Sequence, residues 1–327
     1  MTHDSDPDSA STARSRWTDL GGPVHYLDYG GPVDGPVLVC VHGLGGSAVN
    51  WSAVAPLLTD RCRVLAIDLP GHGRTWAYGR RTGVAANRAV LHRFVREVVG
   101  RPVILVGNSM GGMISLLQAA AEPADVTGLV LVAPAVPFVP TRPDPLVTAM
   151  FAAYGTPVLG RGLLAARRRF VPPERIVDMT MSLCTVDPSR IPADVVEEHY
   201  AVARARAAYK DANRDFLVAA RSVLATGADV RRGGYRNIIR GITAPVLMLH
   251  GDQDRLVPLA SARAAAKANP AWRFIVLNDA GHVPQLEWPR EIATAVLYWL
   301  DSAGHEAELA ASAPGSTAPD PDGAPAP

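Results

Sequence analysis

The fold of this chain is decided by the stretch Val103-Ile104-Leu105-Val106-Gly107-Asn108-Ser109-Met110-Gly111-Gly112, in which an apolar run leads into a G-x-S-x-G motif. The residues from 110 to 121 have a helical pattern that ends before Pro123. A strand, a sharp turn and a helix in this order expose the central serine, and the flanking glycines leave out side chains that would collide in the turn. We therefore predict that Ser109 is a nucleophile. The alternative is a turn in which the serine only hydrogen-bonds its own backbone.

The composition is that of an ordinary globular protein. The chain has 327 residues, of which 48% are hydrophobic and 19% charged, enough for one large domain with an insertion or for two domains. A formal charge of +1 lacks the basic excess that phosphate backbones or anionic membranes select, so we expect no nucleic-acid partner. Two local basic clusters, 167–169 and 231–232, are interpreted as solvated faces.

The cysteines and the N-terminal residues indicate a cytoplasmic protein. Cys40, Cys62 and Cys184 have no C-x-x-C spacing, and an odd number cannot all pair within one chain. Residues 1–16 are polar without an apolar core, so they do not form a secretory signal, and no apolar run is long enough to span a bilayer. We expect no integral membrane segment, no metal site and no cofactor.

Short apolar runs alternate with helical segments along the chain. The runs 37–41, 64–67, 103–106, 129–132, 246–249 and 274–277 are continuously apolar, as expected for strands buried on both faces of a parallel sheet. Residues 24–29 alternate and predict an antiparallel edge strand. The strand rhythm stops between residues 135 and 243. We therefore predict a core of 16–136 and 243–301, a helical lid at 137–242, and disordered tails at 1–15 and 302–327.

A serine nucleophile requires a general base and a carboxylate that orients the base. Two histidines, His282 and His305, lie after the carboxylates that follow a downstream strand. His305 lies in the polar C-terminal segment, whereas His282 directly follows the last predicted strand. We therefore predict His282 as the base.

The acid candidates are Asp252 and Asp254, just beyond the predicted strand 246–249. We choose Asp254 because the form G-x-x-D-x-x-x-P is the one expected for the turn that carries the acid. Asp252 is assigned to capping that turn through its side chain, and Asp279 is assigned to a turn.

Acyl transfer also requires two backbone N–H groups that bind the oxyanion, each contributing on the order of 10²–10³ in rate. Met110, directly after the nucleophile, is predicted to supply one. Leu44, in the glycine-rich loop after the strand 37–41, is predicted to supply the other. His42 at the start of that loop is interpreted as a buttress.

Five segments resemble the motifs of the α/β-hydrolase family, in the family's order, over about residues 20–301. They are HGLGGS (42–47), DLPGHGRT (68–75), GNSMGG (107–112), GDQDRLVP (251–258) and GHVPQLEWP (281–289). The resemblance implies a mostly parallel central sheet flanked by helices, with the helical lid inserted before the strand that carries the acid. Asp68, Gly71 and Gly73 match a structural turn of the family, and His72 and His250 are interpreted as structural histidines.

Other functions remain open beside ester hydrolysis. The loop 43–48 also fits a loose dinucleotide fingerprint with Asp68 in the place of the ribose-binding acid, but that interpretation leaves Ser109, Asp254 and His282 unexplained. GNSMGG also resembles hydrolases of carbon–carbon bonds, which usually have an aromatic residue where this chain has Val283. Cofactor-free perhydrolases or haloperoxidases share the same catalytic groups. A ligand receptor on the same fold is a further alternative.

The substrate pocket is predicted from the loops around the serine and from the lid. Gly43, Asn108 and Val283 adjoin the predicted catalytic residues in sequence. In the lid, apolar surface is offered by Met150, Phe151, Tyr154, Met179, Met181 and Leu183. Together they predict a serine hydrolase that cleaves the ester of a hydrophobic small molecule or lipid.

Overall fold

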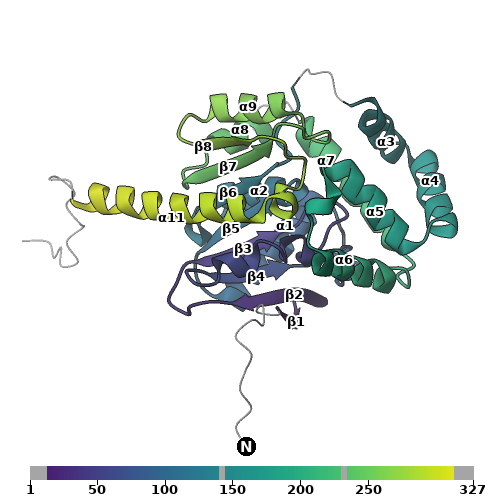
Figure 1. The fold of residues 1–327 in the computed structure, drawn as a ribbon, viewed down its shortest axis with the longest axis horizontal. Coiled ribbons are helices and arrows are strands. Elements are labelled where there is room, and N and C mark those ends of the chain that lie inside the picture. The colour runs from purple at the N-terminus through teal and green to yellow at the C-terminus, as the bar shows by residue number, and fades with distance from the viewer. Residues whose placement is uncertain (1–12, 140–143, 230–233, 313–327) are drawn as a thin grey trace, which may run out of the picture.

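Residues 13–139, 144–229 and 234–312 are described by a computed structural model, in which helices cover both faces of one twisted sheet (Figure 1). Residues 1–12 and 313–327 of the predicted disordered tails, residues 140–143 and 230–233 of the predicted lid, and with them the basic cluster 231–232, lie outside the described residues. Among the described residues no helix combines the length and the apolar character needed to cross a membrane.

The sheet has eight strands in the order β1-β2-β4-β3-β5-β6-β7-β8, parallel except for the antiparallel pairs that β2 forms with β1 and β4. Their bounds are β1 (Arg14–Asp19), β2 (Pro23–Gly30), β3 (Val37–Val41), β4 (Arg63–Ile67), β5 (Val103–Asn108), β6 (Val126–Val132), β7 (Val246–Gly251) and β8 (Arg273–Leu277). The neighbours of β3 are β4 on one side and β5 on the other, so the chain reverses its direction across the sheet there. Ligands of open parallel sheets bind outside the carboxyl ends of the strands at such a point.

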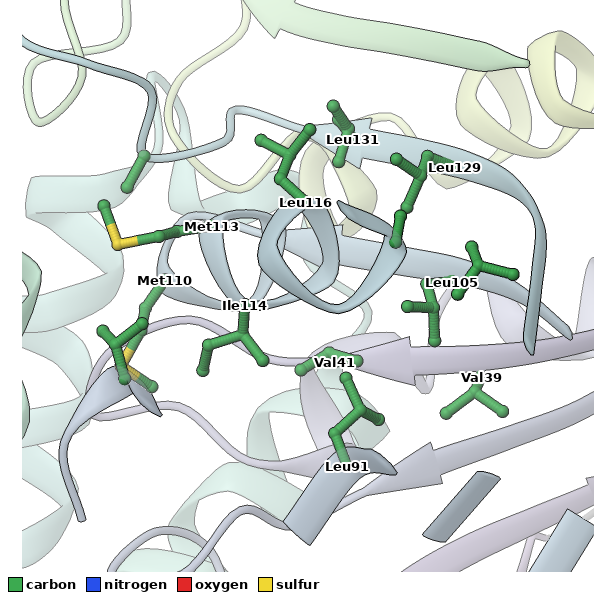
Figure 2. Packing of buried hydrophobic residues seen from close by; sticks show 14 of the residues in the cluster. Val39, Val41, Leu91, Leu105, Met110, Met113, Ile114, Leu116, Leu129 and Leu131 are labelled. Carbon is green, nitrogen blue, oxygen red and sulfur yellow. The ribbon is translucent and has the colours of Figure 1, made fainter. Parts of the chain in front are cut away.

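Both faces of the central strands are buried, which explains why these strands are continuously apolar. On one face, Val39, Val41 and Leu105 pack against α2, as Figure 2 shows. That face is covered by α1 (Val84–Arg93), the π-helical turn η3 (Phe94–Val99), α2 (Met110–Ala121), α8 (Tyr235–Arg240) and α9 (Leu259–Ala268). The other face is covered by the 3₁₀ helices η1 (Ala48–Trp51) and η2 (Ala55–Leu58) and by α11 (Pro289–Ser312).

A helical segment connects β6 to β7 (Figure 1). Three of its α-helices begin with a proline, whose fixed φ suits the first helical position. The segment contains α3 (Pro145–Gly155), α4 (Pro157–Phe170), α5 (Pro173–Cys184), η5 (Pro188–Arg190), α6 (Ala193–Arg206) and α7 (Ala212–Gly227), and it ends with α8 against α2. Two short elements complete the fold, η4 (Pro123–Asp125) after α2 and α10 (Pro284–Glu287) before α11.

The structure corrects two boundaries and the assignment of the edge strand. Residues 14 and 15 belong to β1, which is exposed and polar but pairs along its whole length with β2. As a result β2 is not the edge strand that its alternation predicted. At the other end, α11 continues to Ser312 instead of ending near 301, because the residues after 304 are rich in Ala, Glu and Leu, which extend an existing helix readily.

Candidate active site

Ser109 lies between the end of β5 and the start of α2 with φ 53° and ψ −117°, a backbone conformation rarely adopted by residues other than glycine. Such strain costs on the order of 1–3 kcal/mol and persists where neighbouring contacts enforce it. Here the Ser109 N–H donates to the Val132 carbonyl (3.2 Å), and the Ser109 carbonyl accepts from Met113 (3.1 Å) and Ala135 (2.9 Å).

The two motif glycines explain how the turn closes. A Cβ on Gly107 would lie 2.7 Å from the backbone of Gly111, and a Cβ on Gly111 would lie 2.1 Å from the Val41 carbonyl oxygen. Side chains at these positions are therefore excluded. The first turn of α2 is packed directly against the end of β3.

His282 and Asp254 form a buried pair beside this turn. His282 follows β8, and its Nδ1–H donates to Asp254 Oδ2 at 2.8 Å, so the ring nitrogen that does not contact the carboxylate is Nε2. Burial would raise the pKa of the Asp254 carboxyl, but His282 and the hydrogen bonds to the carboxylate outweigh it and lower that pKa.

Asp254 also caps its own turn, a role that we had assigned to Asp252. Its Oδ1 accepts from the N–H groups of Leu256 (2.8 Å) and Val257 (2.9 Å). Asp252 instead accepts from the Ala280 N–H at 3.4 Å. The carboxylate that faces His282 is therefore fixed by the same turn that carries it.

Asn108, the residue before the serine, joins the two halves of the site. Its buried Nδ2 group donates to the carbonyls of Val132 and His282, both at 3.0 Å. The loops that follow β5, β7 and β8 thus bring Ser109, Asp254 and His282 to one end of the sheet.

The loop after β3 lies against the serine. A Cβ on Gly43 would be 3.0 Å from both Ser109 Cβ and Asn108 Oδ1, and Leu44 is the next residue. On the other side of the serine, Met110 is the first residue of α2, and no carbonyl of the helix reaches the N–H of that position. The two predicted oxyanion donors therefore lie on the two segments that flank Ser109.

Two buried polar groups hold the loop after β3 in place. His42 accepts from the Leu69 N–H at Nε2 (3.0 Å) and donates from Nδ1 to the Gly43 carbonyl (2.7 Å). Burial lowers the pKa of His42, so it is a neutral buttress. Asp68 accepts from the N–H of Ala48 (2.6 Å), the first residue of η1, and from His25 Nδ1 (2.7 Å).

The predicted pocket residues separate into two apolar clusters. Met150, Phe151 and Tyr154 of α3 belong to one cluster, which also contains Leu44 and Phe216 of α7. Val283 instead packs with Met181 of α5, Ile191 and Val195. Met179 is 53% exposed and lies in neither cluster, because it is on the outer side of α5.

Sequence reasoning missed a buried carboxylate, Glu287, next to the histidine loop. Its Oε1 accepts from the N–H groups of Val186 (2.7 Å) and Asp187 (3.2 Å), and its Oε2 accepts from the Gly281 N–H (2.7 Å). The next N–H, that of His282, donates to the Cys184 carbonyl at 2.6 Å. The histidine loop is therefore tied to the end of α5. A carboxylate within the mostly apolar run 283–288 was the available signal.

His250 was interpreted as a structural histidine, but in the structure it lies beside the carboxylate of Asp254. Its Nε2–H donates to the Val257 carbonyl (2.8 Å) and lies 3.3 Å from Asp254 Oδ2, and both side chains are fully buried. Burial lowers the pKa of His250, so it stays neutral. Asp254 Oδ2 thus has two histidines within 3.3 Å.

One cluster among the described residues has metal-ligand chemistry, formed by His92, Glu122 and Asp125. Asp125 already accepts from Arg96 (3.0 Å), and Gln118 contacts His92 (3.2 Å). The cluster lies at the far end of α2 from Ser109, about 18 Å away at 1.5 Å per helical residue. It contributes nothing to the candidate site.

The fold and the serine turn define a hydrolase of the α/β class, and the comparisons agree. The model of the alpha/beta hydrolase family matches residues 38–295, so the chain belongs to this family. Over 82% of its length the chain is 31% identical to a pimeloyl-[acyl-carrier protein] methyl ester esterase of Methylococcus capsulatus, of which it covers 96%.

Two further proteins resemble this chain. A dihydrolipoyllysine-residue acetyltransferase component of the acetoin cleaving system of Pseudomonas putida is 27% identical over 87% of the chain, which spans 66% of that protein. The structure of 2-hydroxy-6-oxo-6-phenylhexa-2,4-dienoate hydrolase from Rhodococcus sp. strain RHA1 superposes with a TM-score of 0.68 at 22% identity, covering 89% of this chain and 100% of the other. That likeness concerns the fold.

Proposed function

We propose that this protein is a serine hydrolase that cleaves carboxylic esters of hydrophobic small molecules or lipids. The observation that carries the proposal is the strained Ser109, joined through Asn108 to a histidine whose Nδ1–H is bound by a buried carboxylate. The 31% identical methyl ester esterase supports an ester as the substrate.

In the proposed mechanism, Ser109 Oγ attacks the ester carbonyl carbon while its proton moves to His282 Nε2. The N–H groups of Leu44 and Met110 hold the oxyanion, and Asp254 stabilises the imidazolium. The ester C–O bond then breaks, and His282 returns the proton to the leaving alcohol. Water attacks the acyl-enzyme by the same route, which releases the carboxylic acid and restores Ser109.

We further propose that residues 137–242 form a lid over the serine and line the acyl pocket. The apolar cluster that contains Leu44 together with Met150, Phe151 and Phe216 supports this role, as does the contact of Gly45 with Phe216, where a Cβ on Gly45 would lie 3.1 Å from the ring. A pocket of this lining favours an apolar acyl or aryl group. The three free cysteines support a reducing compartment, which we propose to be the cytoplasm.

The proposal is tested with p-nitrophenyl esters of graded chain length and a fluorophosphonate label mapped to its residue. We expect the label on Ser109 and a loss of about 10⁴-fold or more in kcat/KM for Ser109→Ala. Ser189→Ala, an exposed serine of η5, is the matched control and should be unchanged.

Two results would contradict the proposal. Near-wild-type turnover by Ser109→Ala would show that Ser109 is not the nucleophile. Turnover of a 2-hydroxy-6-oxohexa-2,4-dienoate without turnover of any ester would assign the site to carbon–carbon bond cleavage instead.

A further inference from the structure

Helix α4 is attached to the rest of the protein along one narrow side. Gly160 and Leu164 are buried there, and a Cβ on Gly160 would lie 2.9 Å from the Ala153 carbonyl oxygen. Arg168 donates to the carbonyls of Ala207 (2.9 Å) and Tyr209 (2.8 Å). In Figure 1 this helix lies at the outer rim of the helical segment, beside α3.

The opposite side of α4 is apolar and faces solvent. Leu159, Leu163, Ala166 and Phe170 follow one another at spacings of four, three and four residues, so they form one stripe along the helix. Their large members are 58% (Leu159), 45% (Leu163) and 76% (Phe170) exposed, and Val158 beside them is 81% exposed. Contiguous exposed apolar surface of this kind marks an interaction site in a folded protein.

The charges around this stripe are all positive. At 100° per residue, Arg167 lies on one side of it and Arg169 on the other, whereas Arg161 lies on the opposite side of the helix. Residues 145–173 contain no Asp or Glu. The acidic residues directly before and after this range form ion pairs with other arginines, Asp144 with Arg255 (2.8 Å) and Glu174 with Arg204 (3.1 Å). Because the whole chain has a formal charge of only +1, this basic apolar face is a local feature.

We propose that α4 docks this protein onto an anionic lipid surface, lying in the interface with the stripe Leu159–Leu163–Ala166–Phe170 inserted and its arginines among the headgroups. An amphipathic helix with leucine and phenylalanine on one side and arginines beside them has the chemistry that such an interface binds. A second copy of the chain fits less well, since a two-fold contact through this stripe would bring like-charged arginines together. Arg167 and Arg169, which belong to the basic cluster 167–169 predicted to be a solvated face, thereby gain a ligand.

The proposed surface goes beyond the proposed function and does not depend on it. It lies on the side of α4 away from Leu164, and Leu164 belongs to the apolar cluster that Leu44 packs against, so α4 itself stands between the proposed lipid surface and that cluster. Binding to lipid is measurable with Ser109→Ala as well as with the wild type, which separates the two proposals experimentally.

The test is sedimentation of the full-length protein with vesicles of phosphatidylcholine alone or with about 30% phosphatidylglycerol, at low and high salt. We expect the wild type to bind the anionic vesicles at least about tenfold more tightly than the neutral ones, with binding falling as salt rises. Leu163→Asp should weaken binding more than tenfold, and the double variant Arg167→Glu/Arg169→Glu at least tenfold.

Matched controls carry the same chemical changes elsewhere. Val33→Asp replaces an 80% exposed valine after β2, and Arg263→Glu replaces an exposed arginine of α9. Hydrolysis of a short soluble ester by every variant checks the fold. Equal vesicle binding by Leu163→Asp and Val33→Asp would overturn the proposal, as would a wild type that binds no vesicles, or a dimer that Leu163→Asp dissociates.

Discussion

Replacing Glu287 by Gln tests how firmly the histidine loop is held. The carboxylate accepts three backbone N–H groups, two at Oε1 and one at Oε2, and the side chain is buried. An amide keeps one oxygen and turns the other position into a donor. At least one N–H therefore loses its acceptor and faces an NH₂ group.

The cost follows from the hydrogen bonds lost. A hydrogen bond to a charged acceptor contributes about 1.5–3 kcal/mol, and a buried N–H without an acceptor costs a similar amount. We expect Glu287→Gln to lower the free energy of unfolding by about 2–4 kcal/mol. Because Gly281 precedes His282, a shift of the loop by about 1 Å should also lower kcat by up to about 10²-fold, with KM changed less.

Urea unfolding at pH 7.5 and steady-state ester hydrolysis are the assays. The matched control is Asp279→Asn, an isosteric change of a half-exposed carboxylate in the same loop that pairs with Arg190 and should cost less than about 1 kcal/mol. If Glu287→Gln unfolds within about 0.5 kcal/mol of the wild type, its three hydrogen bonds do not stabilise this loop as argued.

Two further predictions concern the acid and the buried histidines. Asp254→Asn should lower kcat by about 10⁴-fold while Asp252→Asn changes it little, because Asp254 alone faces His282 Nδ1; the reverse order would exchange the two roles. Burial lowers the pKa of His42, His72, His199 and His250 in the folded protein below 6.5, so below that pH the unfolded chain binds more protons and stability must fall. Each of these histidines lowers the free energy of unfolding by up to about 1.4 kcal/mol per pH unit below 6.5, until the pH reaches the pKa of that histidine in the folded protein. Urea unfolding at pH 7.5 and 5.5 measures this, and equal stability at both would refute it.

Much of the core was predictable because a strand that is buried on both faces has a continuous run of apolar residues in the sequence. The apolar runs at 37–41 and 103–106 became β3 and β5, and α2 begins and ends at the predicted residues. β1 was missed for the converse reason. It is stabilised by backbone hydrogen bonds to β2 while its side chains are exposed, so no apolar pattern marks it.

The site was less completely predictable, because a sequence motif identifies candidate residues but does not show all the hydrogen bonds that each of them forms. The motif GDQDRLVP contains both aspartates, and only the geometry shows that Asp254 both caps the turn and binds His282. The sequence did not indicate which of the predicted pocket residues lie in the same cluster. The sequence prediction grouped Val283 with the residues of α3. In the structure, contacts between segments distant in sequence place Val283 in another cluster, with Met181.

The helical segment leaves the sheet from one strand and returns to the next. β6 and β7 are parallel neighbours, paired from Leu129 with Val246 to Val132 with Leu249. Extending a loop between fixed ends is inexpensive, since each doubling of its length costs only about 0.6 kcal/mol. The segment can therefore lengthen, shorten or be exchanged during evolution while strand order and serine turn stay intact. New specificities would then arise by replacing helices between β6 and β7, provided that the replacements keep a partner for Glu287 and for the loop at Leu44.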